Sequence, residues 1–222
     1  KISLYLALGT SLMYSQWFDI DQAGFTRSYY ISYPNNAINP TPLIINMHGF
    51  GSNAQEQQLY SEMDQFAHSE NIAVVYPEGL NNAWNVFTFW DGNSYDDVSF
   101  ISAIIDDISE NFNIDLNKVY ACGMSNGGYM SYRLACDLSD KITAFGSVTG
   151  NFMINTEEND CLDQNREIPI IHFHGTSDAV VNYFPPSFDQ SLTIGESINF
   201  WTDYNDLTIE SAEQISSNVE IY

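Results

Sequence analysis

The stretch that most constrains this chain is Lys118–Gly128, which reads KVYACGMSNGG. Its first part is a short apolar run, typical of a buried strand. The next five residues match the pattern G-x-S-x-G with Ser125 in the middle, and the residues after them read as a helix. A strand, a tight turn with serine at its tip and a helix are the setting of a nucleophile elbow. Side chains at Gly123 or Gly127 would collide with neighbouring backbone in so sharp a turn. The alternative is a strand-to-helix turn with an incidental serine.

Length and charge limit the classes of protein to consider. A chain of 222 residues can form one domain with a proper core, and the sequence has no internal repeat or linker that would divide it. The net charge of −23 would repel nucleic acid and anionic lipid. We therefore expect neither nucleic acid nor a membrane as a partner, and a neutral substrate suits this surface better than a polyanion.

The N-terminus resembles a targeting segment. Lys1 precedes an apolar run, Ile2–Met13, that is too short to span a bilayer and is followed by small and polar residues. This pattern predicts a secretory signal peptide over residues 1–16 and a catalytic domain over 17–222. The alternative is an N-terminal strand or helix packed on the core. We accordingly expect a secreted protein, extracellular or periplasmic.

Strands alternate with helices along the rest of the chain. That order predicts an α/β fold with a mainly parallel central sheet covered by helices on both faces. The expected strands are 25–33, 43–47, 72–76, 119–122, 144–148 and 168–173, and the expected helices are 55–70, 98–112, 128–138 and 194–204. In the first of these helices Leu59, Met63, Phe66 and Ala67 share one face.

Two further strand ends carry residues suited to acyl chemistry, since reactive loops of a parallel sheet follow the strands' carboxyl ends. The segment His48-Gly49-Phe50-Gly51 suits a loop that donates a backbone N–H to an oxyanion. We nominate the amide of Phe50, with Gly49 or Gly51 as the alternatives in this loop, and the amide of Asn126 as the second donor. Asp178 follows a later strand and would hold and stabilise a catalytic imidazole. The alternative is a turn aspartate that bonds its own backbone.

These candidate residues include no general base for Ser125. The four histidines are His48, His68, His172 and His174, and all precede Asp178. The pattern favours a surface position for His68 and core or loop-bracing roles for the others. We therefore expect a chain cut short at Tyr222, with the base encoded downstream. The alternatives are a non-catalytic relative, or His174 recruited as the base.

The three cysteines have two different expected roles. Cys122 lies in the strand before the elbow and reads as a small buried hydrophobe. This leaves Cys136 and Cys161, for which we predict a disulfide bridge if the protein is exported. No His/Cys cluster has the spacing of metal ligands, so we expect no metal and no cofactor.

Together these motifs resemble those of the secreted polyhydroxybutyrate depolymerase/feruloyl esterase family of α/β-hydrolases. The resemblance rests on HGFGSN, YPEG, DDVSF, GMSNGGYMSYRLAC and HFHGTSD and covers roughly Phe25 to Tyr204. It implies an α/β-hydrolase fold that lacks its C-terminal part, with Ser125 as nucleophile and Asp178 as acid. It also implies a catalytic histidine in a C-terminal loop that this sequence does not reach. Members often carry cysteines at these two positions, which supports the bridge.

The resemblance also implies the substrate class. Feruloyl or acetyl esters on polysaccharides and short polyhydroxyalkanoate esters all fit it. An aromatic loop, with Trp84, Phe87, Phe89 and Trp90, could flank the serine, and we nominate Trp84 and Trp90 for substrate binding. Ordinary loop packing is the alternative for each ring. A second hypothesis is a catalytically inactive relative that binds carbohydrate or polymer through this loop.

Overall fold

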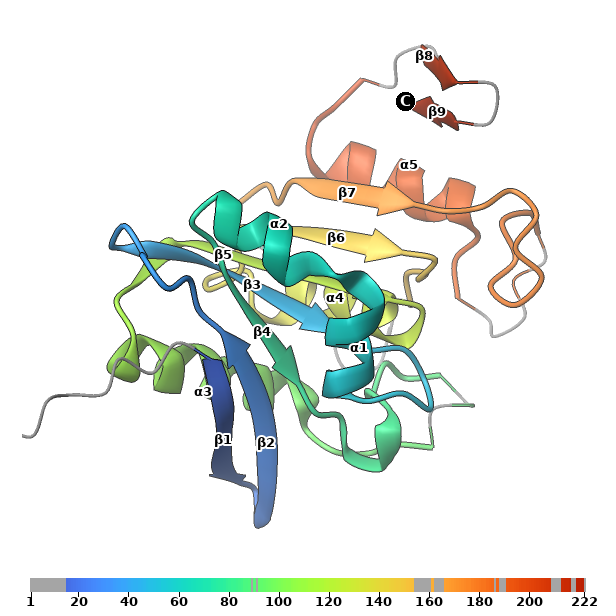
Figure 1. Ribbon diagram of the computed structural model, residues 1–222. Helices are drawn as coiled ribbons and strands as arrows, with labels where there is room; N and C mark the ends of the chain where they lie inside the picture. Colours follow the sequence, from blue (N-terminus) through green and yellow to red (C-terminus); the bar gives the residue numbers. More distant parts are fainter. Residues whose placement is uncertain are drawn as a thin grey trace, which may run out of the picture.

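The computed structural model describes residues 15–88, 90, 92–153, 161, 166–185, 187, 191–208, 213–216 and 219–221. Within these residues, one sheet of seven strands has the order β1-β2-β4-β3-β5-β6-β7 (Figure 1). The strands from β4 through β3, β5 and β6 to β7 pair in parallel, and β1 and β2 join the edge beyond β4 in antiparallel fashion. The expected mainly parallel sheet is confirmed.

The elements have the following bounds. The strands of the sheet are β1 Ser15–Gln22, β2 Phe25–Ser32, β3 Thr41–Met47, β4 Ala73–Pro77, β5 Ile114–Met124, β6 Ala144–Val148 and β7 Ile170–Phe173. The helices are α1 Ala54–Ser61, α2 Met63–Ser69, α3 Asp97–Asn111, α4 Asn126–Asp137 and α5 Ile194–Tyr204, with a 3₁₀ turn, η1, at Leu80–Asn82. A small antiparallel pair, β8 Glu213–Ser216 and β9 Val219–Ile221, follows α5.

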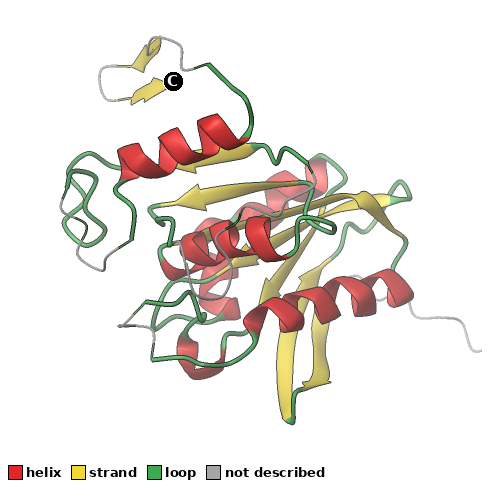
Figure 2. Ribbon diagram, turned by 180° about the vertical axis from the view of Figure 1, so that it is seen from behind, coloured by secondary structure: helices red, strands yellow, loops and turns green. Residues whose placement is uncertain are grey.

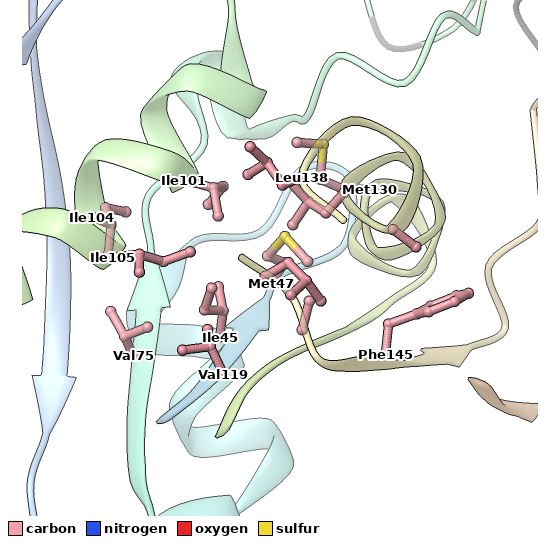
Figure 3. Packing of buried hydrophobic residues seen from close by; sticks show 14 of the residues in the cluster. Ile45, Met47, Val75, Ile101, Ile104, Ile105, Val119, Met130, Leu138 and Phe145 are labelled. Atoms are coloured by element: carbon pink, nitrogen blue, oxygen red, sulfur yellow. The ribbon is translucent and has the colours of Figure 1, made fainter. Parts of the chain in front are cut away.

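Helices cover both faces of the sheet, as expected. Figure 1 shows α1 and α2 on one face, and Figure 2 shows α3, α4 and α5 on the other. Successive residues of a strand point to opposite faces, so Val75 joins the core under α3 and α4 while Val74 joins a smaller cluster under α1 and α2. The larger core is drawn in Figure 3 and includes Ile45, Met47, Ile101, Ile104, Ile105, Val119, Met130, Leu138 and Phe145.

The predicted single helix over 55–70 is wrong. Glu62 has a left-handed backbone, φ 50°, which ends α1 and starts α2. The break rotates the two halves, so the predicted apolar face does not form, and Leu59 and Phe66 are 70% and 72% exposed. The buried positions of α1 are instead Ala54 and Gln57. Gln57 is satisfied there because its Nε2 donates to Asn46 Oδ1 at 2.8 Å.

Strand β1 was not predicted, and it completes a hairpin with β2. The expected signal peptide lies mainly outside the described residues, and β1 begins at Ser15, two residues before the expected start of the domain. None of the helices in the described ranges is both long and apolar enough to cross a bilayer.

The hairpin brings a buried ion pair that the sequence did not reveal. Arg27 on β2 contacts Asp97 at the start of α3, with Nη2 and Oδ1 2.6 Å apart and both side chains almost fully buried. The guanidinium also lies over the Phe100 ring, 3.6 Å from its centre. The pair therefore ties the antiparallel edge of the sheet to α3.

One face of β5, β6 and β7 carries no helix in the described residues. Together with α1 it forms an apolar groove of about 590 Å³. Val148, Ile171 and Phe173 are 40%, 56% and 55% exposed along it. An apolar surface of this kind is unusual for a domain whose other sheet face is well covered.

Candidate active site

The serine predicted at the elbow lies at the junction of β5 and α4. Ser125 has φ 52° and ψ −118°, a backbone conformation that few L-residues adopt. Its N–H donates to Val148 O at 2.9 Å, which fixes the turn against the end of β6. A Cβ at Gly127 would lie 2.2 Å from Met47 O, and one at Gly123 would lie 2.5 Å from Gly127. The glycines of the motif are therefore required by close backbone contact, and the half-buried serine is held at the tip of a strained turn.

The predicted oxyanion loop lies against this turn. His48–Gly51 follows β3, and a Cβ built on Gly49 would lie 3.6 Å from Ser125 Cβ. The loop is closed by two backbone hydrogen bonds, from Gly51 N–H to Asn82 O at 2.7 Å and from Ser52 N–H to Gly49 O at 3.1 Å. Because the Gly51 amide is used in this way, Phe50 remains the donor nominated in this loop. Asn126 begins α4, so its N–H has no partner within the helix and lies at the positive end of the helix dipole.

His48 braces this loop from within the core. The Gly79 N–H donates to Nε2 at 3.0 Å, so Nδ1 carries the proton and donates to Gly49 O at 2.8 Å. The side chain is fully buried, and burial lowers the pKa of His48 to about 4. A neutral imidazole with both nitrogens bonded acts as a brace, as the sequence favoured, and is not placed to take a proton from Ser125.

Trp84 is not a substrate-binding residue, contrary to prediction. Its side chain is fully buried. The indole N–H donates to His48 O at 2.9 Å. The backbone of Trp84 exchanges two hydrogen bonds with the Asn126 side chain, at 2.6 and 3.0 Å. Trp84 therefore clamps the His48–Gly51 loop to the residue that follows Ser125.

We expect Trp84→Phe to lower the free energy of unfolding by about 1–3 kcal/mol, because His48 O would be left buried without its donor. Chemical denaturation measures this change. Trp17→Phe is the matched control, since Trp17 is 49% exposed and should change stability by less than about 0.5 kcal/mol. Equal effects of the two substitutions would contradict the clamp.

Trp90 lies where an acyl or alcohol group could meet it. Its ring is half-buried and packs edge-on against Phe50 and Tyr129, each at 5.6 Å between ring centres. Phe50, which belongs to the predicted oxyanion loop, is itself 55% exposed. The role of Trp90 in substrate binding stays a prediction, and Phe89 lies outside the described residues.

Asp178 follows β7 in a turn at the same edge of the sheet as Ser125. Two hydrogen bonds connect the end of β7 to Ser125. Thr149 N–H donates to Phe173 O at 2.8 Å, and Ser125 N–H donates to the carbonyl of Val148, the residue before Thr149. Asp178 Oδ1 accepts from the N–H groups of Val180 and Val181 at 2.8 and 2.9 Å. Oδ1 therefore behaves as expected for the alternative, an aspartate that bonds the backbone of its own turn. Its Oδ2 lies 3.7 Å from His174 Nε2, so it is not fixed by a short bond there.

His172 of β7 and His174, which directly follows that strand, form an ordered hydrogen-bonded series with Tyr132 of α4. Tyr132 OH lies 2.8 Å from His172 Nδ1, and His172 Nε2 lies 3.2 Å from His174 Nδ1. His174 Nε2 is 2.8 Å from the carbonyl oxygen of Val181, which can only accept, so Nε2 donates there. His174 Nδ1 then accepts from His172 Nε2, and His172 Nδ1 accepts from the Tyr132 hydroxyl. His174 is 1% exposed and both its nitrogens are engaged. This geometry favours bracing over the alternative that His174 acts as the base.

Stability should fall in mild acid because buried His48 and His172 take up protons less readily than they do in the unfolded chain. Burial lowers the pKa of His172 to about 4, with a smaller contribution from His174, as burial does for His48. The unfolded chain takes up protons below about pH 6.5 and the folded chain only near pH 4, so stability is complete above pH 6.5 and is lost as the pH falls towards 4. For His48 alone the loss at pH 5 is about 2 kcal/mol.

Urea denaturation at pH 7 and pH 5 measures this loss. The variant His172→Gln removes one of the titrating groups, so its stability should depend less on pH over this interval. If the difference in stability between pH 7 and pH 5 were the same in His172→Gln as in the unaltered protein, the contribution of His172 would be contradicted.

The predicted disulfide between Cys136 and Cys161 is confirmed. Cys122 is a free cysteine on β5, and burial raises the pKa of its thiol to about 12. Among the described residues, no three His, Cys, Asp or Glu side chains converge on a point that could hold a metal ion.

Comparison with known proteins places this geometry among esterases. Residues 94–214 match the model of the Phospholipase/Carboxylesterase family. The chain is 32% identical to a bifunctional acetylxylan esterase/xylanase of Neocallimastix patriciarum, over 73% of this chain and 23% of that protein. It is 29% identical to feruloyl esterase D of Neurospora crassa, over 78% of this chain and 61% of that protein. The chain therefore spans less than two thirds of the length of these relatives.

Solved structures agree on the fold. A thermostable esterase superposes with a TM-score of 0.62 at 20% identity, covering 86% of this chain and 51% of that one. An acetyl xylan esterase from Aspergillus awamori gives 0.51 at 17% identity, covering 62% of this chain and 53% of that one. At these identities the likeness shows the α/β-hydrolase fold alone.

Proposed function

Because the chain belongs to the Phospholipase/Carboxylesterase family of α/β-hydrolases, we propose that it is a serine esterase that forms an acyl-enzyme on Ser125. The observation that carries this proposal is the strained turn at Ser125, packed against the His48–Gly51 loop. Among the described residues, the Phe50 N–H of this loop donates no backbone hydrogen bond. Curated relatives named as feruloyl and acetylxylan esterases support a carboxylic ester as the substrate.

The chemistry proceeds in two steps. Ser125 Oγ attacks the ester carbonyl, and the amides of Phe50 and Asn126 stabilise the oxyanion. The proton removed from Oγ passes to the leaving alcohol, which departs. Water then attacks the acyl-enzyme by the same route, releasing the carboxylic acid and restoring the serine.

Asp178 is the proposed acid of this site. Its Oδ1 is fixed by two backbone N–H groups, which leaves Oδ2 to accept a hydrogen bond from the N–H of an imidazole ring. The base is assigned to none of the four histidines of this chain. His48 and His174 have both nitrogens bonded, His172 lies between Tyr132 and His174, and His68 is on α2 with Nε2 3.2 Å from Ser32 Oγ.

For the substrate we propose feruloyl or acetyl esters of polysaccharides, with short polyhydroxyalkanoate esters as a second class to test. Two curated relatives carry the first two activities in their names. The exposed Phe50 ring and the half-buried Trp90 ring offer an apolar surface for an acyl group next to the serine. The disulfide supports secretion as a proposal, because such bridges persist in oxidising compartments.

A fluorophosphonate probe and a panel of esters test the proposal on the full-length protein. We expect labelling at Ser125, located by peptide mapping, and hydrolysis of methyl ferulate, acetylated xylan or a hydroxybutyrate dimer. Labelling at another residue would refute the nucleophile. Absence of hydrolysis with every ester would refute the esterase.

One observation favours a second function. Since no histidine of this chain is placed to activate Ser125, the fold could instead serve as a non-catalytic carbohydrate or polymer binder. This reading predicts saturable binding of the polymer that is lost in Trp90→Ala, with no turnover of any ester by the full-length protein. Turnover above the rate of the uncatalysed reaction would exclude it.

A further inference from the structure

A second cavity, of about 620 Å³, is formed by residues outside the proposed active site. Its walls come from the segment that follows Trp84 and from Arg133 of α4, and the side chains used below are those of Asn85, Phe87, Ser94, Tyr95, Asp96 and Arg133. Unlike the groove on the other sheet face, this cavity is lined mainly by polar residues. Nothing in the esterase chemistry described above uses it.

The walls of the cavity are fixed by the fold. Asn85 N–H donates to the buried carboxylate of Asp97 at 2.7 Å, and its side-chain amide donates to Tyr95 O at 3.1 Å. Arg133 Nη1 donates to Asn85 O at 2.5 Å, and its guanidinium lies 3.9 Å from the centre of the Phe87 ring. The loop is therefore held to both α3 and α4, so the cavity exists before any ligand arrives.

The polar groups that remain suit hydroxyl groups of a ligand. In the described residues, Arg133 Nη2 and the hydroxyls of Ser94 and Tyr95 are not used in a hydrogen bond within the chain. Asp96 uses Oδ1 to cap α3, which leaves Oδ2 as an acceptor. A sugar hydroxyl both donates and accepts, so a ring bearing several of them can satisfy this mixed set.

The charges of the cavity favour a neutral ligand. The positive charge of Arg133 is already paired with Asp137, with Nε and Oδ2 3.1 Å apart. Asp96 adds a negative charge to the same cavity, and the whole chain carries −23. An anionic ligand such as an acidic sugar would be repelled.

The cavity also lies within reach of the same polymer chain as Ser125. Trp84 is bonded to Asn126, and the next residue, Asn85, is bonded to Arg133. These two attachment points are seven residues apart on α4, a distance of about 10 Å along the helix axis. A glycan with an ester at Ser125 could thus place another sugar unit in the cavity.

From these observations we propose that the cavity of Ser94, Tyr95, Asp96 and Arg133 is a subsite for a neutral sugar unit of the glycan whose ester meets Ser125. The inference rests on the proposed function for the identity of the polymer. Binding of a bare oligosaccharide requires no turnover, so it can be tested separately.

The test is calorimetric titration of xylotetraose into the full-length Ser125→Ala protein, with and without the added pair Ser94→Ala and Tyr95→Phe. The pair removes two hydroxyls and keeps the contact between the Tyr95 and Phe25 rings, so the fold should persist. We expect binding that weakens about tenfold in this variant, because two hydrogen bonds are lost. Tyr30→Phe with Ser109→Ala removes two hydroxyls outside the cavity and should leave the affinity unchanged.

Three results would overturn the subsite: no binding at about 10 mM xylotetraose, affinity unaffected by the cavity variant, or tetragalacturonate binding as tightly as xylotetraose. Hydrolysis of 4-nitrophenyl acetate and of the panel of esters by the protein with Ser125 intact is measured in parallel. Oligosaccharide binding without this hydrolysis would uphold the subsite and refute the esterase, and hydrolysis without binding would do the reverse.

Discussion

Replacement of Ser125 by alanine is expected to lower kcat for ester hydrolysis by about 10⁴-fold or more. The reason is that the strained turn presents this one hydroxyl to the space beside the oxyanion loop. Losing the nucleophile leaves only the oxyanion donors and substrate binding to accelerate the reaction. Steady-state hydrolysis of 4-nitrophenyl acetate by the full-length protein gives the measurement, and circular dichroism checks that the variant is folded.

The matched control for this substitution is Ser139→Ala. Ser139 follows α4 and is half-buried, and its side chain has no part in the proposed site. Its activity should equal that of the unaltered protein. Residual activity of Ser125→Ala within tenfold of the control would assign the nucleophile elsewhere.

Replacement of Arg27 by methionine is expected to lower the free energy of unfolding by about 3–5 kcal/mol. The substitution leaves the carboxylate of Asp97 buried without its cation. Asp97 also accepts from Asn85 N–H at 2.7 Å and Asn93 Nδ2 at 3.3 Å, so the loop before α3 should loosen as well. Urea denaturation at pH 7 measures the loss.

Two comparisons isolate the effect of burial. Lys118 forms an ion pair with Asp115 at 3.4 Å, but its side chain is 56% exposed, so Lys118→Met should cost less than about 1 kcal/mol. The double variant Arg27→Met with Asp97→Leu should recover part of the stability, because burial itself raises the pKa of Asp97 and lowers that of Arg27. The recovery stays incomplete because Asn85 N–H also loses its acceptor. A loss in Arg27→Met no larger than in Lys118→Met would contradict the role of the buried pair.

The features that the sequence predicted well are those set by local chemistry. The elbow depends on two glycines and a short apolar run, all within eleven residues, and the structure shows the contacts that require those glycines. Strand β6 and helix α5 were predicted with their observed bounds because each has a clear pattern and a clear start, such as the capping box of Thr193 and Glu196. Their positions follow from a few neighbouring residues.

The features that were missed depend on distant contacts. The break at Glu62 is a left-handed residue without a glycine to mark it, and Leu59 and Phe66 became exposed because α1 and α2 are separate helices. Arg27 and Asp97 are seventy positions apart and meet only after the hairpin pairs with β4.

Trp84 shows the same limit at the site. Its aromatic ring in a loop suggested a substrate contact, and only the bonds to His48 and Asn126 show a clamp. The histidines were predicted better, since the alternation of His172 and His174 indicated a shared face, and their rings stack with centres 5.3 Å apart. No sequence pattern indicated that the Tyr132 hydroxyl would hydrogen-bond to His172.

The bridge from Cys136 to Cys161 bears on how the protein must be produced. Cys136 lies near the end of the helix that begins beside Ser125, and Cys161 precedes the strand that leads to Asp178. The bond spans 25 residues, a loop for which closure in the unfolded chain corresponds to about 3.5 kcal/mol. Synthesis in a reducing bacterial cytosol would forgo that amount and leave α4 and the segment before β7 without their covalent tie. Export to a periplasm, or refolding with a glutathione couple, is the route by which active material should be obtained.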